Sequence, residues 1–244
     1  MESNYVSLHI PVLDHGYCKL IAKGCWGDDE IIVESARMST DGGFVSWLPY
    51  TGHPKGDQGL LSYLYNHKHM TPFEMAGMTV EVQAPILCFR EWHRHRSQSY
   101  NEMSGRYSEL PNLFYIPSVE RLMAGAQSQK SKQGSQEGFS AKEAWDLRGE
   151  LVYATQRSRE AYQRLLEAGL SRELARLVVP VNQYSRMRAS ANLRNWLAFL
   201  TLRLDESAQW EIRQYALAVG TLVSQLFPRT YQLFLTQKEK ATGT

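Results

Sequence analysis

The alternation of apolar and polar residues along the chain predicts four strands. Residues 78–84 give the clearest signal, because apolar side chains occupy every second position and polar ones the positions between, as in a half-exposed strand. Residues 5–12 and 16–23 predict two short strands that the turn residues 14–16 join into a hairpin. Residues 184–191 interleave arginine with methionine and alanine, which predicts a fourth, exposed strand.

Apolar residues three and four positions apart predict most of the helices. The predicted helices cover residues 31–37, 60–71, 144–168, 193–202 and 208–226. The expected amino-terminal caps are Asp28 or Asp29 for the first of these helices, Asn192 for the helix at 193–202 and Asp205 for the helix at 208–226. Gly169 is expected to end the longest helix. Ser171 is expected to cap a further short helix that stops at Pro180. The chain therefore predicts an α+β fold that is richer in helix than in strand.

A further short helix is predicted from Pro85, which suits a first helical turn. Ile86 and Phe89 lie on one side of this helix, so it would deliver Arg94, His95 and Arg96 at its last turn. Residues 97–105 would then form a loop and residues 107–116 an extended return to the sheet.

Two segments lack any apolar period. Residues 42–59 are rich in glycine and proline, and residues 127–140 are polar and contain Gly134 and Gly138. Both predict loops, and the second predicts a mobile surface loop with no assigned chemistry.

Composition narrows the class of protein. A chain of 244 residues with 43% hydrophobic residues can bury a substantial core as one domain, residues 1–244. The net charge of +2 disfavours a general nucleic-acid binder, since wholesale phosphate neutralisation needs more positive charge. Cys18, Cys25 and Cys88 lack metal-site spacing, and no apolar run suits a membrane span, so we expect reduced thiols in a cytosolic protein that contacts no membrane.

Residues 94–107 carry three arginines, a histidine, a carboxylate, two amides and several hydroxyls, which no apolar period explains. Guanidinium groups can bind a small anion bidentately, and Gly105 allows a ligand to approach the backbone. The segment therefore predicts a binding site for a phosphate or a planar heterocycle rather than a solvated helix end.

Other site chemistries fit the residues less well. The pairs His67/His69 and His93/His95 suggest a metal site, but residues two apart on a helix point to different faces, and neighbouring arginines repel a cation, so we expect no metal. Ser104 lacks the context of a hydrolase nucleophile, and phosphate-loop glycine motifs are absent from the sequence.

The order of the polar motifs is similar to that of a known family. Arg94-His95-Arg96, followed after seven residues by Ser104, resembles the signature of the flavin-dependent thymidylate synthases. Residues 101–108 extend the resemblance, which covers about residues 14–234. Residues 71–74, 203–205 and 208–211 match as well, whereas the 127–140 loop resembles an insertion.

The resemblance implies a methyltransferase with a family-specific α/β fold, in which a mixed antiparallel sheet packs against long helices. The enzyme would transfer methylene from methylenetetrahydrofolate to C5 of dUMP and reduce it to methyl with hydride from FADH2, which NADPH regenerates. It would be a homotetramer whose active sites each use more than one chain.

The resemblance also assigns residues. Implied FAD contacts are Ser39, Thr71, Glu74, Arg94, His95, Arg96, Glu102, Asn192 and Arg194. Implied dUMP contacts are Glu91, Trp92, Arg94, Glu102, Met103, Ser104, Gly105, Arg106, Arg176 and Arg203. Arg203 is the implied catalytic residue, since a fixed cation beside uracil N3 stabilises its ionised form and makes C5 more nucleophilic.

Three positions depart from the family pattern. Glu91 stands where relatives often have glutamine, and Ala198 and Ser207 stand where an amide or imidazole would contact the flavin. Two other classes stay open on the residues alone: a non-enzymatic nucleotide or RNA-binding module that uses the same arginines, and a metal-dependent phosphohydrolase that uses the His-x-His pairs.

Overall fold

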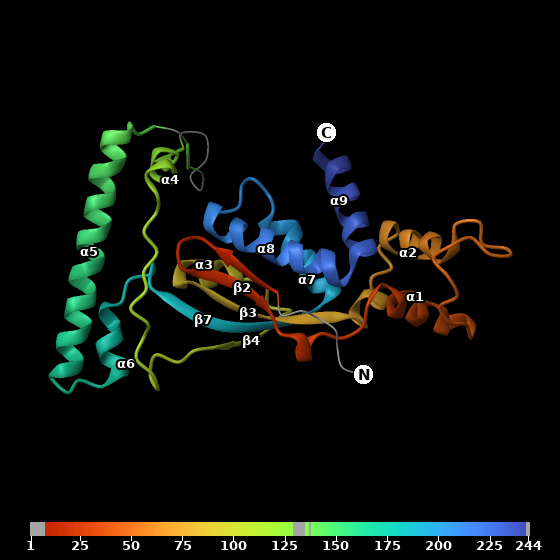
Figure 1. Ribbon diagram of the computed structural model, residues 1–244, viewed down its shortest axis with the longest axis horizontal. Helices are drawn as coiled ribbons and strands as arrows, with labels where there is room; N and C mark the ends of the chain where they lie inside the picture. The colour runs from red at the N-terminus through yellow and green to blue at the C-terminus, as the bar shows by residue number, and fades with distance from the viewer. Residues whose placement is uncertain (1–7, 129–134, 137, 243–244) are drawn as a thin grey trace.

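The fold centres on a five-stranded antiparallel sheet with strand order β1-β2-β3-β7-β4 (Figure 1). The computed structural model describes residues 8–128, 135–136 and 138–242. The strands of this sheet are β1 His9–Val12, β2 Gly16–Leu20, β3 Gly77–Pro85, β4 Ser99–Glu102 and β7 Tyr184–Asn192, and β5 Ala126–Gln127 pairs separately with β6 Ser135–Gln136. The predicted opening hairpin and the two longer predicted strands are confirmed.

Helices cover one face of the sheet and extend from both of its ends. The α-helices are α1 Asp29–Arg37, α2 Gly56–Asn66, α3 Ile86–Trp92, α4 Val119–Met123, α5 Ala141–Glu167, α6 Arg172–Ala175, α7 Leu193–Arg203, α8 Trp210–Leu226 and α9 Pro228–Thr242. Short 3-10 turns are η1 Ala22–Gly24, η2 Met38–Thr40, η3 Thr71–Glu74 and η4 Arg176–Val178. Figure 1 shows α7 and α8 over the sheet, α1 and α2 beyond one end, and α5 and α6 beyond the other.

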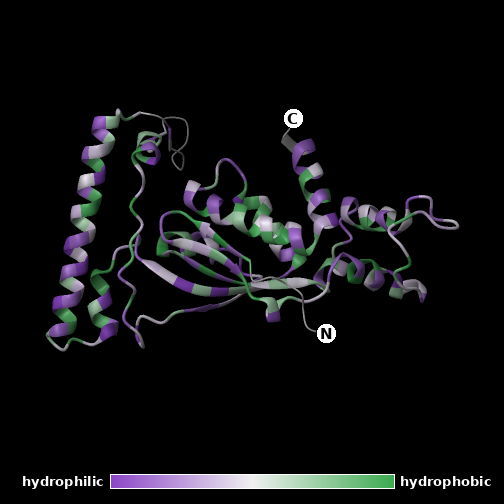
Figure 2. Cartoon of the chain, viewed as in Figure 1, coloured by the Kyte–Doolittle hydropathy of each residue, from purple (hydrophilic) through white to green (hydrophobic). Residues whose placement is uncertain are grey.

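The core lies between the sheet and the helices α7 and α8. The apolar face of β3 is fully buried, from Met78 to Ala84, whereas its polar face is half-buried, as the alternation predicts. Trp196 on α7 is also fully buried, and its Nε1 donates to the Met78 carbonyl oxygen at 3.0 Å. Figure 2 shows that α8 is largely hydrophobic, which fits its burial against the sheet.

Side-chain caps fix several helix starts. Asp28 accepts from the backbone N–H groups of Glu30 and Ile31, both at 3.0 Å, and Asn192 accepts from the N–H of Asn195 at 3.0 Å, as predicted. The long helix α5 ends before Gly169, whose φ of +83° glycine adopts readily. The predicted cap Asp205 is wrong, because its carboxylate accepts from the Ser207 N–H and α8 begins later, at Trp210.

The sheet contains one strand that the sequence pattern does not indicate. Predicted loop 97–105 includes β4, which pairs with β7 in the register Ser99↔Ser190 to Glu102↔Met187. β4 is only four residues long, so its alternation carries little signal. Because β4 and β3 flank it, β7 lies inside the sheet rather than at the predicted exposed position. Residues 107–116 do not join the sheet, apart from an isolated bridge between Phe114 and Gln183.

The helix that begins after Pro85 ends one turn earlier than predicted, at Trp92, so Arg94–Arg96 lie in the following turn.

Helix α2 begins within predicted loop 42–59, where the buried Asp57 accepts from the N–H groups of Val45 and Ser46 at 2.7 and 3.0 Å. It ends at Asn66, earlier than predicted. Residues 129–134 and 137 of predicted loop 127–140 lie outside the described residues.

Helix α9 has no counterpart in the prediction. Its first turn is capped by Asp29 of α1, which accepts from Thr230 Oγ1 at 2.6 Å and from the Arg229 N–H at 2.8 Å. This cap comes from a residue 201 positions away, so no local signal marks the helix start.

The described residues contain no helix long and apolar enough to cross a membrane. Cys18 and Cys88 are buried and Cys25 is partly buried, and all three are free thiols.

Phe199 of α7 links the core to the functional site, since its ring centroid lies 4.6 Å from that of Trp92 and 4.9 Å from that of His95. We expect Phe199→Ala to lower the free energy of unfolding by about 3–5 kcal/mol, because the side chain is fully buried. Leu202→Ala, on the same helix but 60% exposed, should change it by no more than about 0.5 kcal/mol. Urea denaturation checks both variants, and equal effects would contradict this packing.

Candidate active site

The Arg94-His95-Arg96 segment is anchored between α3 and β4. Arg94 and Arg96 are exposed, whereas His95 is buried at 8% exposure. The His95 N–H donates to the Trp92 carbonyl oxygen at 3.0 Å, and its own carbonyl oxygen accepts from the Tyr100 hydroxyl at 2.7 Å. These bonds turn the two arginines outward while the histidine faces the core.

Arg203 lies against this segment at the end of α7. Its Nε donates to His95 Nε2 at 2.9 Å, its Nη1 to Glu91 Oε2 at 2.7 Å, and its Nη2 to the Glu91 carbonyl oxygen at 2.8 Å. Only 13% of the Arg203 side chain is exposed. Three residues that the sequence assigns to the site are therefore brought together, with the guanidinium held at three points.

The contact with Arg203 fixes the chemical state of His95. A guanidinium only donates, so Nε2 must be the unprotonated acceptor and the ring is neutral with its proton on Nδ1. Burial, together with the charge of Arg203, lowers the pKa of His95 to about 4. His95 therefore orients Arg203 and carries no charge at neutral pH.

A second group of predicted residues surrounds Gly105. A side-chain carbon at this glycine would lie 3.3 Å from the end of the Leu110 side chain and 3.6 Å from the Arg176 side chain, so Gly105 lies directly against both residues. The Arg106 N–H donates to Ser104 Oγ at 3.2 Å, and the Arg106 side chain forms an exposed ion pair with Glu173 of α6 at 3.1 Å. The structure thus places Gly105 beside Arg176, with Ser104 and Arg106 adjacent to it in the same turn.

Met103 and Glu102 connect this group to the sheet. The Met103 N–H donates to the Arg186 carbonyl oxygen at 2.8 Å, directly after the last residue of β4, the exposed Glu102. Pairing of β4 with β7 therefore sets the position of the segment that leads to Gly105.

A third group lies at the start of α7. Arg194 Nη1 forms an ion pair with Glu74 Oε1 at 2.5 Å, beside the capping residue Asn192. Asn195 Nδ2 donates to the Ser97 carbonyl oxygen at 3.2 Å, which connects this helix start to the Arg94–Arg96 turn. Thr71, exposed, begins the η3 turn that contains Glu74.

The predicted residues do not converge on one cavity of a single chain. Ser39 lines a cavity of about 470 Å³ between α1 and α2, together with Lys55 and Gly59. Arg176 follows α6, and Figure 1 shows α1 and α6 beyond opposite ends of the sheet. The residues that the resemblance assigns to FAD and to dUMP therefore spread along the molecule.

Two of the implied dUMP contacts already have side-chain partners within the chain. The Trp92 side chain is fully buried against Phe199, and its Nε1 donates to Gln98 Oε1 at 3.0 Å, so this side chain is part of the core. The Glu91 carboxylate is engaged with Arg203. Tyr100 and Gln98, which bond to this part of the chain, lie in the predicted 94–107 segment but are not among the contacts that the resemblance assigns.

Besides Glu91, the other two positions that depart from the family pattern are Ala198 and Ser207. Ala198 lines a cavity of about 620 Å³ with Arg194, Thr201 and Phe234. Ser207 Oγ donates to Asp205 Oδ1 at 2.5 Å within the turn before α8.

The His-x-His pairs contact aromatic neighbours. The His67 ring stacks on Tyr63 with centroids 4.1 Å apart, and the His93 ring lies 4.8 Å from that of Tyr100. In the described ranges, there is no group of three or more His, Cys, Asp or Glu side chains that could hold a metal ion.

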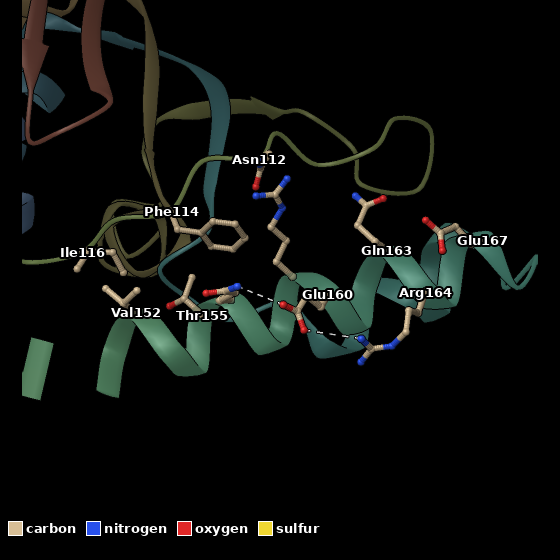
Figure 3. A pocket seen from close by; sticks show the side chains of 11 residues that line it. Asn112, Phe114, Ile116, Val152, Thr155, Glu160, Gln163, Arg164 and Glu167 are labelled. Carbon is tan, nitrogen blue, oxygen red and sulfur yellow. Dashed lines mark hydrogen bonds and ion pairs between the residues drawn. The ribbon is translucent and has the colours of Figure 1, made fainter. Parts of the chain in front are cut away.

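Another cavity, of about 620 Å³, separates α5 from residues 112–116 (Figure 3). Phe114, Ile116 and Val152 form its apolar end, and on its polar side Glu160 accepts from Gln156 at 3.3 Å and pairs with Arg164 at 3.8 Å. None of its lining residues was predicted to belong to the site.

Comparison with known proteins decides the family. The family model described as thymidylate synthase complementing protein matches residues 19–229, most of the chain. The chain belongs to the flavin-dependent thymidylate synthase family.

Named relatives agree with this assignment over nearly the whole chain. A flavin-dependent thymidylate synthase from Thermus thermophilus is 41% identical over 227 residues, covering 93% of this chain and 78% of the relative. Another from Thermosipho africanus is 38% identical and covers 92% of both chains. The structure of the UMP/dUMP methylase PolB from Streptomyces cacaoi, bound with 5-Br dUMP, matches with a TM-score of 0.80 and 32% identity, covering 93% of this chain and 97% of PolB. The predicted family and fold are confirmed.

The neutral state of His95 is testable by NMR of protein labelled with 13C in its histidine rings, with His95→Gln to assign the signal. We expect a pKa of about 4, below the ordinary value of about 6.5. Because protonation is disfavoured in the folded state, the stability that His95 contributes is present above about pH 6.5 and is lost as the pH falls toward 4. Arg203→Met should raise this pKa. Titration of the wild-type ring near 6.5 would contradict the Arg203 contact.

Proposed function

We propose that this chain catalyses the reductive methylation of dUMP to dTMP. The carbon donor is methylenetetrahydrofolate, and the hydride comes from FADH2, which NADPH regenerates. The observation that carries the proposal is the three-point anchoring of Arg203 by Glu91 and His95, inside the family signature. A guanidinium fixed in this way can act on a pyrimidine without moving as the reaction proceeds.

The dUMP phosphate is assigned to the group around Gly105. Arg106 and Arg176 supply positive charge, Ser104 supplies a hydroxyl, and the backbone at Gly105 has no side chain to block a ligand. The ion pair of Arg106 with Glu173 is exposed on both sides and is worth little, so a phosphate dianion can replace the carboxylate.

The donor set also fits a flavin dinucleotide. Among the described residues, neither Arg94 nor Arg96 forms an ion pair, and both are exposed beside the start of α7, where Asn192 and Arg194 lie. Exposed guanidinium groups suit a pyrophosphate. When bound, FAD would supply the hydride that reduces the transferred carbon.

Within this site, Arg203 is assigned to uracil. Three of its five N–H donors are used by Glu91 and His95, which leaves one on each terminal nitrogen. These two can contact O2 and N3 and stabilise the N3 anion. Loss of the N3 proton raises electron density at C5, so C5 can attack the carbon donor although the buried Cys88 is not placed as a nucleophile.

We also propose a homotetramer with active sites shared between chains. The residues assigned to FAD and dUMP extend to opposite ends of one chain, so a complete site needs another copy. Large apolar side chains are exposed on α5 and near α6, including Trp145, Tyr153 and Leu177 at 60%, 62% and 78% exposure. Helix α5 carries hydrophobic residues along its whole length (Figure 2), as a helix at a subunit interface does.

Family membership disfavours both rival classes. A nucleotide or RNA-binding module without catalysis, or a phosphohydrolase built on His67/His69 and His93/His95, would be unlike the named relatives. A flavin absorbance band in the purified protein would separate the synthase from both.

The function is tested by tritium release from dUMP labelled at C5, in the presence of methylenetetrahydrofolate and NADPH. Wild-type protein should release tritium, and Arg203→Ala should lose about 100- to 1,000-fold in turnover while retaining FAD. Lys240→Ala, which removes an exposed positive charge from α9, should keep full turnover. Wild-type turnover in Arg203→Ala would remove the assigned role, and no release by the wild type would contradict the function.

Assembly is tested by sedimentation velocity. Tyr153→Glu places a charge on the exposed apolar surface of α5 and should shift the protein from tetramer to smaller species. Gln232→Glu, which adds the same charge to an exposed position on α9, should leave the tetramer intact. A wild-type monomer would refute the proposed assembly.

A further inference from the structure

The proposed function leaves the Glu91 carboxylate without a task. Its Oε2 accepts from Arg203 Nη1 at 2.7 Å, and 37% of the Glu91 side chain is exposed against 13% of the Arg203 side chain. A glutamine, which the family resemblance leads us to expect here, could accept the same hydrogen bond without the negative charge. The charge at this position therefore needs its own explanation.

Two of the three acceptors that contact Arg203 are neutral, and the third is negatively charged. The Glu91 carbonyl oxygen and His95 Nε2 are neutral acceptors, so they orient the guanidinium and leave its charge unchanged. The Glu91 carboxylate also orients the guanidinium, but its negative charge partly neutralises the positive charge of Arg203. The Arg203 side chain is only 13% exposed, so water screens the guanidinium less than it would at the surface, although it partly screens the Glu91 carboxylate, whose side chain is 37% exposed. The carboxylate therefore still reduces the charge that a ligand meets at the two remaining N–H groups.

Other titratable groups near the pair do not replace this carboxylate. His95 is neutral, and the buried Cys88 thiol, on α3 itself, has its pKa raised by burial and by the charges of Glu211 and Glu91, so it stays protonated. At the end of α7, the charge of Asp205 is opposed by Lys238 and Arg213. Of the described side chains, Glu91 is the carboxylate in contact with Arg203.

We propose that Glu91 is a positioning residue that holds Arg203 in its binding orientation and reduces the positive charge that Arg203 presents to a pyrimidine base. This inference rests on the proposed function, since it assumes that the base lies at Arg203. It replaces direct contact between Glu91 and dUMP, because the carboxylate is already used within the chain. Its consequence is that the bound base loses its N3 proton at a higher pH than it would beside an unopposed guanidinium.

The test uses 5-bromo-dUMP, whose ultraviolet absorption changes when N3 ionises. The absorption of the bound nucleotide is titrated in wild-type protein, Glu91→Gln and Glu34→Gln. Glu91→Gln keeps the shape and the acceptor, so it should lower the apparent N3 pKa by about one unit or more. Glu34→Gln removes the same charge from an exposed position on α1 and should give the wild-type value.

A second variant separates the two roles of Glu91. Glu91→Asp keeps the charge but shortens the side chain, so the N3 pKa should stay close to wild type while turnover in the tritium assay falls severalfold. The acidic limb of the turnover profile should move to lower pH in Glu91→Gln alone. Thermal melting confirms that each variant is folded.

Each outcome has one meaning. An N3 pKa in Glu91→Gln that equals the wild-type value, or lies above it, overturns the inference. A lower N3 pKa in Glu91→Asp that matches Glu91→Gln overturns it as well. Binding of 5-bromo-dUMP to a wild-type protein that cannot turn over dUMP contradicts the proposed function but leaves the Glu91 role testable by absorption. No binding to the wild type contradicts both.

Discussion

The pairing of β7 with both β3 and β4 is the constraint on which the site depends. The ladder between β3 and β7 runs from Gly77↔Asn192 to Pro85↔Tyr184, and β4 lies on the other side of β7. This arrangement brings the turn before β4 next to the helix that follows β7, although Ser97 and Asn195, which bond across this contact, lie 98 positions apart along the chain. Arg94–Arg96 and Arg203 can meet because one strand holds both of its neighbours in register.

The polar site is supported by an apolar layer rather than by a network of charges. Arg203 lies four residues after Phe199 and seven after Trp196, on the face of α7 that packs into the core. An arginine on a buried face needs acceptors for its donors, and His95 and Glu91 provide them. The neutral state of His95 and the low exposure of Arg203 therefore have one cause, which is the packing of α3 against the end of α7.

The sequence identifies much of this arrangement and misses the rest for physical reasons. Strict alternation marks β3, and local capping residues mark α1 and α7, so these elements are predictable. β4 is too short for its pattern to be read, and α9 begins at a cap supplied by Asp29 from far away in the sequence. Motif resemblance identifies Arg203 and Glu91 as site residues, but it cannot show that they contact each other, because that contact depends on tertiary packing.

Asn192 is both the last residue of β7 and the cap of α7, so strand and helix join without a linker. Each residue of an α-helix rotates the chain by about 100° about the helix axis and advances it by about 1.5 Å. Arg203 lies eleven residues after this junction. Inserting or deleting a single residue in α7 would turn the guanidinium to another side of the helix, with no loop to absorb the change. Natural variation in chain length should therefore be excluded from this helix and confined to segments such as the one before α5.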